Sequence, residues 1–374
     1  MLNDEYSEEI LFPENRRENR LERKIISRTD RSKYKKTDRN KWIQHKKPLS
    51  SPKKSSEKIF RGRVLSVMGL EICVGSEGRK FQCVLRGRFK KDRTRMKNLI
   101  AVGDFVLFEE TAKGEGVIVD IEDRKTSLSR ADNASRLKNH LIAANIDQVI
   151  ITVSVLKPIL KPSLIDRYII ASYKGGMEPV VAVNKMDLLE EDSIKKEDRE
   201  REEDLCRRLA QAYRVIGIPF ILLSAKTGKG LRLLEEAMRG KASVFSGQSG
   251  VGKSCLINRL TGMNLKTGEI VEKTKKGAHT TTRANLLPLD SGGWCMDTPG
   301  IKSFGVWDLK RSEVERYFEE IAFFAEKCKF ADCIHLQEPG CAVLRAVEEG
   351  EISSLRFDSY RFLIEEISKG HTPR

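Results

Sequence analysis

The sequence predicts a protein of three folded parts: an N-terminal all-β barrel, a central parallel α/β domain, and a mostly helical C-terminal domain. Three observations indicate this fold class. Short β-rich runs separated by glycines fill residues 58–130, and apolar strands alternate with longer helical stretches over residues 131–305. Residues 306–374 are helical and aromatic-rich, and they carry a Cys/His cluster. The length of 374 residues suits two to three such domains.

A basic arm, residues 1–57, precedes these parts. The formal net charge of the chain is +15, and residues 15–56 hold sixteen lysines and arginines against four acids. This segment has no hydrophobic periodicity, so we expect it to be mostly disordered. It is either a solvated tail or a contact for nucleic-acid phosphates, and the sequence leaves both interpretations open.

The sequence also bounds location and partners. It contains no run of about 18 apolar residues, so we expect no membrane partner. Its first residues lack the apolar region of a secretory signal and include acids that transit peptides avoid, which indicates a cytoplasmic protein. We expect a monomer.

The barrel is predicted from five short strands with glycine turns within about seventy residues, a pattern typical of the oligonucleotide-binding (OB) barrel. One connection, RGRFKKDRTRMK at residues 86–97, is densely basic. On such a barrel a basic loop favours contact with nucleic acid over a merely solvated role.

The α/β domain contains a helix that we expect to start near Ser163, with Ser163 and Asp166 capping it directly after Pro162. Further along, the tetrapeptide NKMD follows an apolar strand, and SAK follows the next strand. The carboxylate of Asp187 can accept from both N1–H and the exocyclic amine of guanine, a donor pair that adenine lacks. The predicted base-contacting residues are Asn184, Lys185, Met186, Asp187, Ser224, Ala225 and Lys226. Among these, Lys185 is expected along the base plane and the Ala225 amide at guanine O6.

A phosphate-binding loop is predicted at residues 247–254, where GQSGVGKS fits G-x-x-x-x-G-K-S between an apolar strand and a helix. Its glycines let backbone amides surround the phosphates at a helix N-terminus. We expect Lys253 to reach the β- and γ-phosphates, Ser254 to bind Mg²⁺, and the Cys255 amide to touch the α-phosphate. The other expected contacts are Gly247, Gln248, Ser249, Gly250, Val251 and Gly252. Together with the base motifs, this loop specifies GTP rather than ATP.

The switch elements follow the loop. Asp297, at the end of an apolar strand, is expected to hold Mg²⁺, and the Gly300 amide to sense the γ-phosphate. In HTTTR, one of residues 280–282 would complete the Mg²⁺ coordination, and Thr281 is favoured. His279 either orients the attacking water or has a structural role. Ile301 cannot orient water as a glutamine would, so we expect slow intrinsic hydrolysis and a partner that completes the site.

The order of the motifs indicates a circular permutation. In ordinary GTPases the phosphate loop comes first and the base motifs last, but here both base motifs precede the loop. The segment after DTPG therefore runs directly into the C-terminal domain. We hypothesise that a movement at Gly300 reorients that domain.

A structural zinc site is predicted from Cys328-x4-Cys333-x-His335-x5-Cys341, which offers three thiolates and one imidazole. Tetrahedral Zn²⁺ is the natural occupant of a Cys₃His set, and the closed set leaves no open coordination position. A cluster of cysteines in a chain without an export signal also favours a metal over disulfides.

Taken together and in their order, NKMD, SAKTGKG, SGQSGVGKS, GAHTTTR, DTPGI and CKFADCIHLQEPGCAV resemble the ribosome small subunit-dependent GTPase A family over about residues 58–369. The resemblance implies an OB barrel, a circularly permuted GTPase and a C-terminal zinc domain. It also implies action on the 30S subunit and its 16S rRNA late in maturation, with GTP hydrolysis to GDP stimulated by the subunit. Two other hypotheses remain: an RNA-binding scaffold that binds GTP without turning it over, and an ATP-using protein.

Overall fold

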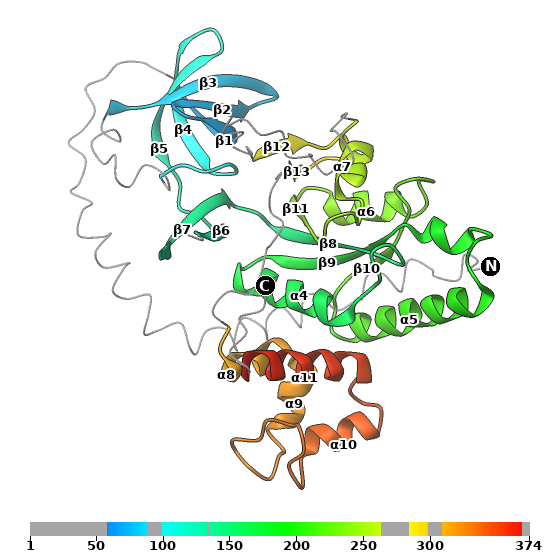
Figure 1. The fold of residues 1–374 in the computed structure, drawn as a ribbon. Coiled ribbons are helices and arrows are strands. Elements are labelled where there is room, and N and C mark those ends of the chain that lie inside the picture. The colour runs from blue at the N-terminus through cyan, green and yellow to red at the C-terminus, as the bar shows by residue number, and fades with distance from the viewer. Residues whose placement is uncertain (1–57, 88–98, 133–134, 263–283, 298–308, 369–374) are drawn as a thin grey trace. The chain divides into compact units, whose positions relative to one another are not determined.

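The structure, a computed structural model, describes residues 58–87, 99–132, 135–262, 284–297 and 309–368 (Figure 1). Side chains are described over the same ranges apart from residues 129–140 and 297. Several sequence predictions fall outside the described residues and stay predictions: those for the arm 1–57, residues 88–97 of the basic connection, His279, Thr281, Gly300 and Ile301.

Five strands close into the predicted barrel. They are β1 (Ile59–Met68), β2 (Glu71–Ser76), β3 (Arg79–Leu85), β4 (Phe105–Ala112) and β5 (Glu115–Ile121). Antiparallel pairs join β1 to β2, β2 to β3, β4 to β5 and β1 to β4, while β3 and β5 pair in parallel, so the strands form a ring. The interior is apolar, and the ring centroids of Phe81 and Phe108 lie 4.9 Å apart in it. Alternation of buried and exposed side chains along the strands explains why the sequence shows a period of two.

A hairpin of β6 (Ser127–Asp132) and β7 (Ser135–Ala144) leads into a parallel sheet. The parallel strands lie in the order β10 (Phe220–Leu222), β9 (Glu178–Asn184), β8 (Gln148–Ser154), β11 (Ala242–Ser246) and β13 (Trp294–Asp297). An antiparallel strand, β12 (Asn285–Pro288), extends the sheet beyond β13. A pairing of Ser66 with Asn285 continues it into β1 of the barrel.

Helices flank the parallel strands on both sides. In Figure 1, α4 (Pro162–Lys174) and α5 (Lys196–Val215) lie on one side, and α6 (Leu231–Met238) and α7 (Lys253–Thr261) lie on the other. A short 3₁₀ turn, η3 (Met186–Glu190), follows β9. Strand β8 is buried along its whole length, as expected for the centre of a parallel sheet covered by helices. The carboxyl ends of the parallel strands meet at one edge, where ligands bind in such sheets.

The C-terminal part is helical, as the sequence predicts. It comprises α8 (Arg311–Val314), the 3₁₀ turn η4 (Glu315–Tyr317), α9 (Glu319–Ala325), α10 (Ala342–Glu348) and α11 (Ser354–Ser368). Phe318, Tyr360 and Leu363 belong to its apolar core, which also includes Ile170 of α4. Helix α11 therefore packs directly against α4 of the α/β domain.

The predicted side-chain cap at the start of α4 is wrong. The helix begins at Pro162, its N-cap is Lys161, and no side chain caps it. Proline suits the first helical position because its missing N–H would have no partner there. Ser163 and Asp166 therefore do not form the capping pair that their spacing suggested.

Asp166 instead belongs to a buried charge network. It is 1% exposed, and its Oδ1 accepts hydrogen bonds from the Tyr213 hydroxyl at 2.8 Å and from the guanidinium of Arg356 on α11. Arg356 also donates to Glu320 of α9, at 2.7 Å from Nε to Oε1. Burial alone would lower the pKa of Arg356, but the two carboxylates outweigh it and raise the pKa. The network joins the C-terminal helices to the α/β domain through three charged side chains.

Candidate functional site

The predicted nucleotide motifs gather at the carboxyl ends of neighbouring parallel strands. Asn184 ends β9, SAK follows β10, and the phosphate loop follows β11. Ser154, the last residue of β8, pairs with Asn184, and Ser246 of β11 pairs with Ile151 of β8. The sheet order β10-β9-β8-β11-β13 thus brings together motifs that are far apart in the sequence.

Two glycines let the phosphate loop lie close to its neighbours. Gly247 has a φ of +144°, and a Cβ there would lie 2.0 Å from the carbonyl oxygen of Thr152. Gly252 has a φ of +96°, and a Cβ there would lie 2.3 Å from Nδ2 of Asn184. Any other residue at these positions would meet both an unfavourable backbone conformation and a clash. The glycines of the motif are therefore explained by geometry alone.

Lys253 begins α7 and folds back over the loop. Its Nζ donates to the carbonyl oxygens of Gly247 at 2.7 Å and Gln248 at 2.6 Å. Burial lowers its pKa to about 8. Phosphate oxygens are negatively charged and are stronger acceptors than these carbonyls. The ammonium group could therefore exchange the carbonyls of Gly247 and Gln248 for phosphate oxygens. The adjoining Ser254 and Cys255 are exposed in the first turn of α7.

Asn184 connects three motifs. The residue is 1% exposed; its Nδ2 donates to the carbonyl of Val251 in the phosphate loop at 2.8 Å, and its Oδ1 accepts from the Ala225 amide at 3.0 Å. The predicted base site and phosphate loop therefore belong to one site. The Ala225 amide already has a partner, so guanine O6 would have to share or displace this hydrogen bond.

Asp187, in the first base motif, is held by two residues of the second. Its Oδ1 accepts from the Ser224 hydroxyl at 2.5 Å, and its Oδ2 lies 3.8 Å from Nζ of Lys226. The side chain is 11% exposed, so the carboxylate lies in a largely water-excluded place. The amide of Met186 donates to the carbonyl of Leu223, which fixes the two base motifs to each other. Such a carboxylate strongly favours a ligand that offers matching donors.

Lys185 takes a conformation that is rare for a residue with a side chain. Its φ of +66° lies in the left-handed region, and its Nζ donates to the carbonyl of Lys157 at 2.6 Å. The left-handed turn separates Asn184 in the sheet from Asp187 in η3. Strained residues of this kind concentrate at functional sites.

The magnesium ligands are only partly within the described residues. Ser254 lies at the start of α7 with an exposed side chain, and the backbone of Asp297 ends β13 beside β11. The predicted donor types, a hydroxyl at the start of α7 and a carboxylate at the end of β13, fit Mg²⁺.

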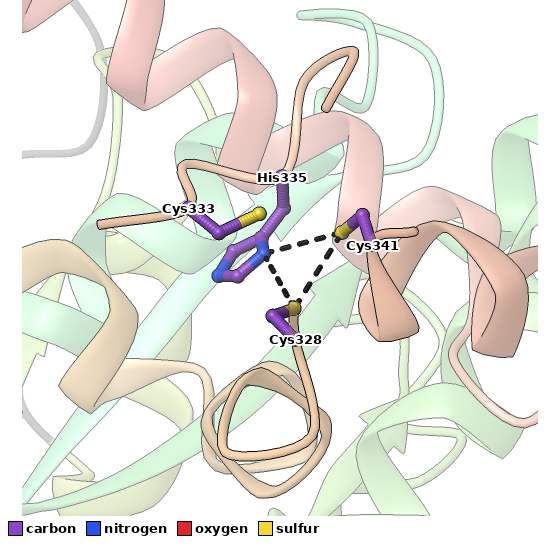
Figure 2. Close-up of side chains that lie close together, drawn as sticks. All are labelled: Cys328, Cys333, His335 and Cys341. Carbon is purple, nitrogen blue, oxygen red and sulfur yellow. Dashed lines mark hydrogen bonds between the residues drawn. The ribbon is translucent and has the colours of Figure 1, made fainter. Parts of the chain in front are cut away.

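The four predicted zinc ligands converge, as Figure 2 shows. Their ligand atoms all lie within 4.8 Å of one another. Nδ1 of His335 is 3.6 Å from Sγ of Cys328 and 3.4 Å from Sγ of Cys341, and the two sulfurs are 3.7 Å apart. A tetrahedral zinc with ordinary bond lengths requires separations of about 3.5 Å for S···N and about 3.8 Å for S···S. The donor set of Cys328, Cys333, His335 and Cys341 therefore fits one Zn²⁺.

Helix α10 supports this cluster. Cys341 is its N-cap and accepts from the amide of Leu344 at 3.5 Å. Burial would raise the pKa of Cys328, but hydrogen bonds from the backbone of Val343 and Ala342 outweigh it, so the pKa is lowered. A thiolate is the form that binds metal, so these backbone hydrogen bonds favour the ligand state of Cys328.

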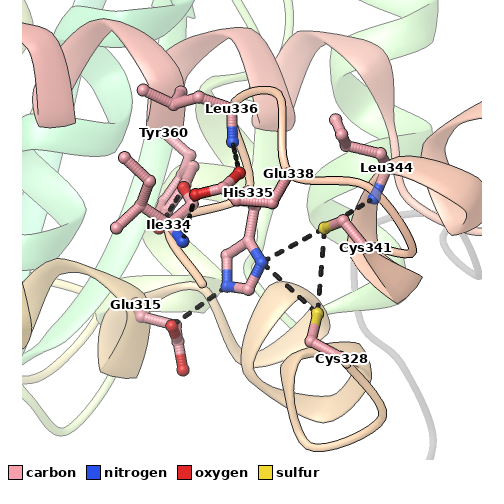
Figure 3. Close-up of polar contacts among 9 residues, drawn as sticks. All are labelled: Glu315, Cys328, Ile334, His335, Leu336, Glu338, Cys341, Leu344 and Tyr360. Atoms are coloured by element: carbon pink, nitrogen blue, oxygen red, sulfur yellow. Dashed lines mark hydrogen bonds and ion pairs between the residues drawn. The ribbon is translucent and has the colours of Figure 1, made fainter. Parts of the chain in front are cut away.

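Two glutamates that the sequence analysis missed surround the cluster (Figure 3). Oε2 of Glu315, in η4, lies 3.2 Å from Nε2 of His335 and can orient the ring that presents Nδ1 to the metal. The carboxylate of Glu338 accepts from the amides of Ile334, Leu336 and Gln337, which closes the loop between the ligands. Glu338 stood inside the predicted motif, but nothing in the sequence marked Glu315.

Among the described residues, no helix is both long and apolar enough to cross a membrane. Two family models match the chain: the RsgA N-terminal domain at residues 61–118 and the RsgA GTPase at residues 121–307.

Curated relatives share most of the chain. The small ribosomal subunit biogenesis GTPase RsgA of Bacteroides fragilis is 39% identical over 296 residues, which cover 79% of this chain and 92% of the relative. The protein of that name from Thermotoga maritima is 39% identical over 304 residues, covering 80% and 94%.

Two solved structures show the same fold. YjeQ from Thermotoga maritima aligns with a TM-score of 0.64 at 34% identity, covering 83% of this chain and 98% of that one. YloQ, described as a circularly permuted GTPase, aligns with a TM-score of 0.65 at 28% identity, covering 87% and 100%. The chain therefore belongs to the RsgA GTPase family.

Proposed function

We propose that this chain binds GTP at the edge of its parallel sheet, hydrolyses it to GDP, and assists late maturation of the small (30S) ribosomal subunit. The observation that carries the nucleotide part is the pair of hydrogen bonds of Asn184, which unite the base motifs with the phosphate loop. The names of the curated relatives support the ribosomal part.

Guanine recognition depends on Asp187. Its carboxylate accepts from N1–H and the 2-amino group, while Ser224 and Lys226 hold it in place. Adenine would leave this nearly buried carboxylate without donors, which costs several kcal/mol and excludes ATP. Lys185 lies along the base plane, and the loop at Ala225 provides amides for O6.

Phosphate binding depends on the loop 247–252 and on Lys253. Backbone amides of the loop and the Cys255 amide surround the phosphates, and the N-terminus of α7 adds a favourable dipole. When phosphates arrive, the Lys253 ammonium leaves the carbonyls of Gly247 and Gln248 and binds the β- and γ-phosphate oxygens. This exchange places the positive charge where negative charge develops during hydrolysis.

Ser254, Asp297 and Thr281 would hold the Mg²⁺ that accompanies GTP, and the ion would supply charge neutralisation for the transferring phosphoryl group. His279 orients the attacking water, and the Gly300 amide senses the γ-phosphate. Because Ile301 cannot orient water, hydrolysis by the free protein is slow. The small subunit completes the site and stimulates the reaction.

The zinc ion has a structural role. Cys328, Cys333, His335 and Cys341 use all four coordination positions, so no position is open for a reacting water. The site fixes the loop between α9 and α10 in a part of the chain whose apolar core also includes Ile170 of α4.

The RNA-binding surface consists of the barrel, the basic connection 86–97 and the arm 1–57, which contact 16S rRNA through its phosphates. The protein acts as a monomer in the cytoplasm, where the subunits are, and without a membrane.

The test measures phosphate release by the full chain with GTP, alone and with purified small subunits. We expect slow release by the free protein and strong stimulation by small subunits, and no stimulation by large subunits as the matched control. Lys253→Ala should abolish release in both conditions while the circular dichroism spectrum stays native. Tight GTP binding without stimulated release would instead support the scaffold hypothesis, and equal affinity for ATP would contradict the guanine site.

A further inference from the structure

Arg259 joins the helix of the phosphate loop to the base motif. It lies on α7, and its Nε donates to the carbonyl of Ala225 at 3.1 Å while its Nη2 donates to the carbonyl of Lys226 at 2.9 Å. The planar guanidinium thus holds two successive carbonyls in a fixed fork. Nothing in the GTP-binding motifs themselves requires an arginine at this position.

The carbonyls of Ala225 and Lys226 share their peptide units with the N–H groups of Lys226 and Thr227, so these two hydrogen bonds fix the directions of those two amides. In a trans peptide unit the C=O and N–H groups point in opposite directions. The carbonyl of Ala225 points to Arg259, so the amide of Lys226 points away from it. On the other side of the loop, the amide of Thr227 donates to the Ser224 hydroxyl at 3.1 Å. The short segment between Ser224 and Thr227 is therefore held from both sides.

We propose that Arg259 is a positioning residue for guanine selectivity, which holds the loop amide of Lys226 where O6 of the base is recognised. This inference rests on the proposed GTP site. The amide of Ala225 already donates to Asn184, so guanine O6 would compete with Asn184 for it. Because Arg259 holds the loop, a second amide, that of Lys226, points away from the guanidinium and is placed to serve O6. Arg259 acts through the backbone and does not touch the ligand.

The position of Arg259 allows a clean substitution. Its side chain is exposed, whereas Leu256, Ile257 and Leu260 make the buried face of α7. Exposed side chains contribute little to global stability, so Arg259→Met should fold and keep the helix. Arg259→Lys keeps the charge but loses the two-point fork. Arg207→Met on α5 serves as the matched control, because Arg207 is an exposed arginine outside both base motifs and pairs with Asp204 of its own helix.

The experiment measures the affinity of the full chain for GDP, 6-thio-GDP, IDP and ADP by calorimetry. The thio analogue weakens only the acceptor at position 6, and IDP lacks only the 2-amino group that Asp187 recognises. In Arg259→Met we expect GDP and IDP affinity to fall by about the same factor, on the order of fivefold to tenfold. We expect 6-thio-GDP affinity to change less than about twofold, so that the preference for GDP over the thio analogue falls. The GDP and IDP affinities of Arg259→Lys should lie between those of the unmodified protein and those of Arg259→Met. The affinities of Arg207→Met should match those of the unmodified protein.

Two results would overturn the inference. If all nucleotides weaken by one common factor, Arg259 supports the fold of the site and not O6 recognition. If no affinity changes, or if only the ratio of GDP to IDP changes, the loop amides do not depend on it. Failure of the proposed function looks different, because the unmodified chain would then show no preference for GDP over ADP.

Discussion

At the scale of single residues, Asp187 is the side chain that we propose selects guanine over other bases. We expect Asp187→Asn to weaken GDP binding by more than about tenfold, because an amide cannot accept from both guanine donors. The same change should improve binding of xanthosine diphosphate, whose ring offers acceptors that match an amide donor. Competitive binding with a fluorescent nucleotide measures both effects, and the exposed Asp192→Asn is the control. Unchanged preference for guanine would place the base elsewhere.

Lys253 makes nucleotide binding dependent on pH. Burial lowers its pKa to about 8 in the free protein, and bound phosphates should raise it. Binding near pH 8.5 should therefore take up a proton, and affinity should fall as pH rises above about 8. At pH 6.5 the lysine is already charged, so no uptake by this group is expected. Calorimetry in buffers of different ionisation enthalpy counts the protons, and uptake that is equal at both pH values would contradict the assignment.

At this scale the sequence predicts which motif residues lie close together, since their spacing reflects local backbone geometry, and their roles in binding stay predictions. The glycines at 247 and 252 show why: each has a positive φ and a neighbour at contact distance. Asn184, Asp187 and the zinc ligands come together as expected. Arg259 and Glu315 could not be predicted, because their roles arise from contacts with backbone or side chains far along the chain.

At the scale of elements, the zinc loop depends on η4 through Glu315. We expect Glu315→Gln to weaken zinc retention by about tenfold or more, since the carboxylate orients the His335 ring. Competition with a zinc chelator, followed by a metal-sensitive dye, measures retention without reference to GTP hydrolysis. The exposed Glu326→Gln is the control at the end of α9. Equal retention in both variants would show that the ring is held by packing alone.

Element boundaries show where sequence patterns fail. The run from Pro162 to Asp166 has the composition of a capped helix start, yet α4 has no side-chain cap. A carboxylate near a helix N-terminus normally faces water, and only the fold reveals that this one faces Tyr213 and Arg356. The strands of the barrel and of the parallel sheet can be predicted more readily. Barrel strands alternate apolar and polar residues, and buried parallel strands are apolar throughout.

At the scale of the whole molecule, the order of the motifs predicted a circularly permuted GTPase fold, which the likeness to YloQ confirms. The hypothesis that Gly300 reorients the C-terminal domain stays a prediction. The structure adds a constraint to it, because α11 is joined to α4 by Arg356 and Asp166. Any such movement has to carry α4 with it or break a buried ion pair.

The basic arm should set the salt dependence of RNA binding. We expect removal of residues 1–57 to weaken binding to small subunits and to reduce the slope of log affinity against log salt, because fewer counterions are released. Co-sedimentation over a range of potassium chloride concentrations measures both quantities, with nucleotide held constant. An unchanged slope would show that the arm is a solvated tail.

Replacing Arg356 alone should destabilise the protein more than replacing Asp166, Arg356 and Glu320 together. Arg356→Met alone leaves two carboxylates uncompensated, one of them fully enclosed, and should cost roughly 3–5 kcal/mol of unfolding free energy. Apolar replacement of all three together should cost far less, since no orphaned charge remains. Chemical denaturation of the unmodified protein, the single variant and the triple variant measures this, and a triple variant as unstable as the single one would contradict it.

That asymmetry has an evolutionary consequence. A single substitution in this charge network is expected to give a poorly stable protein, whereas replacement of all three residues is expected to give a protein that still folds. Homologues should therefore either keep all three residues or replace all three. An alignment of the family should show positions 166, 320 and 356 covarying, with few sequences that keep only one or two of the charged residues.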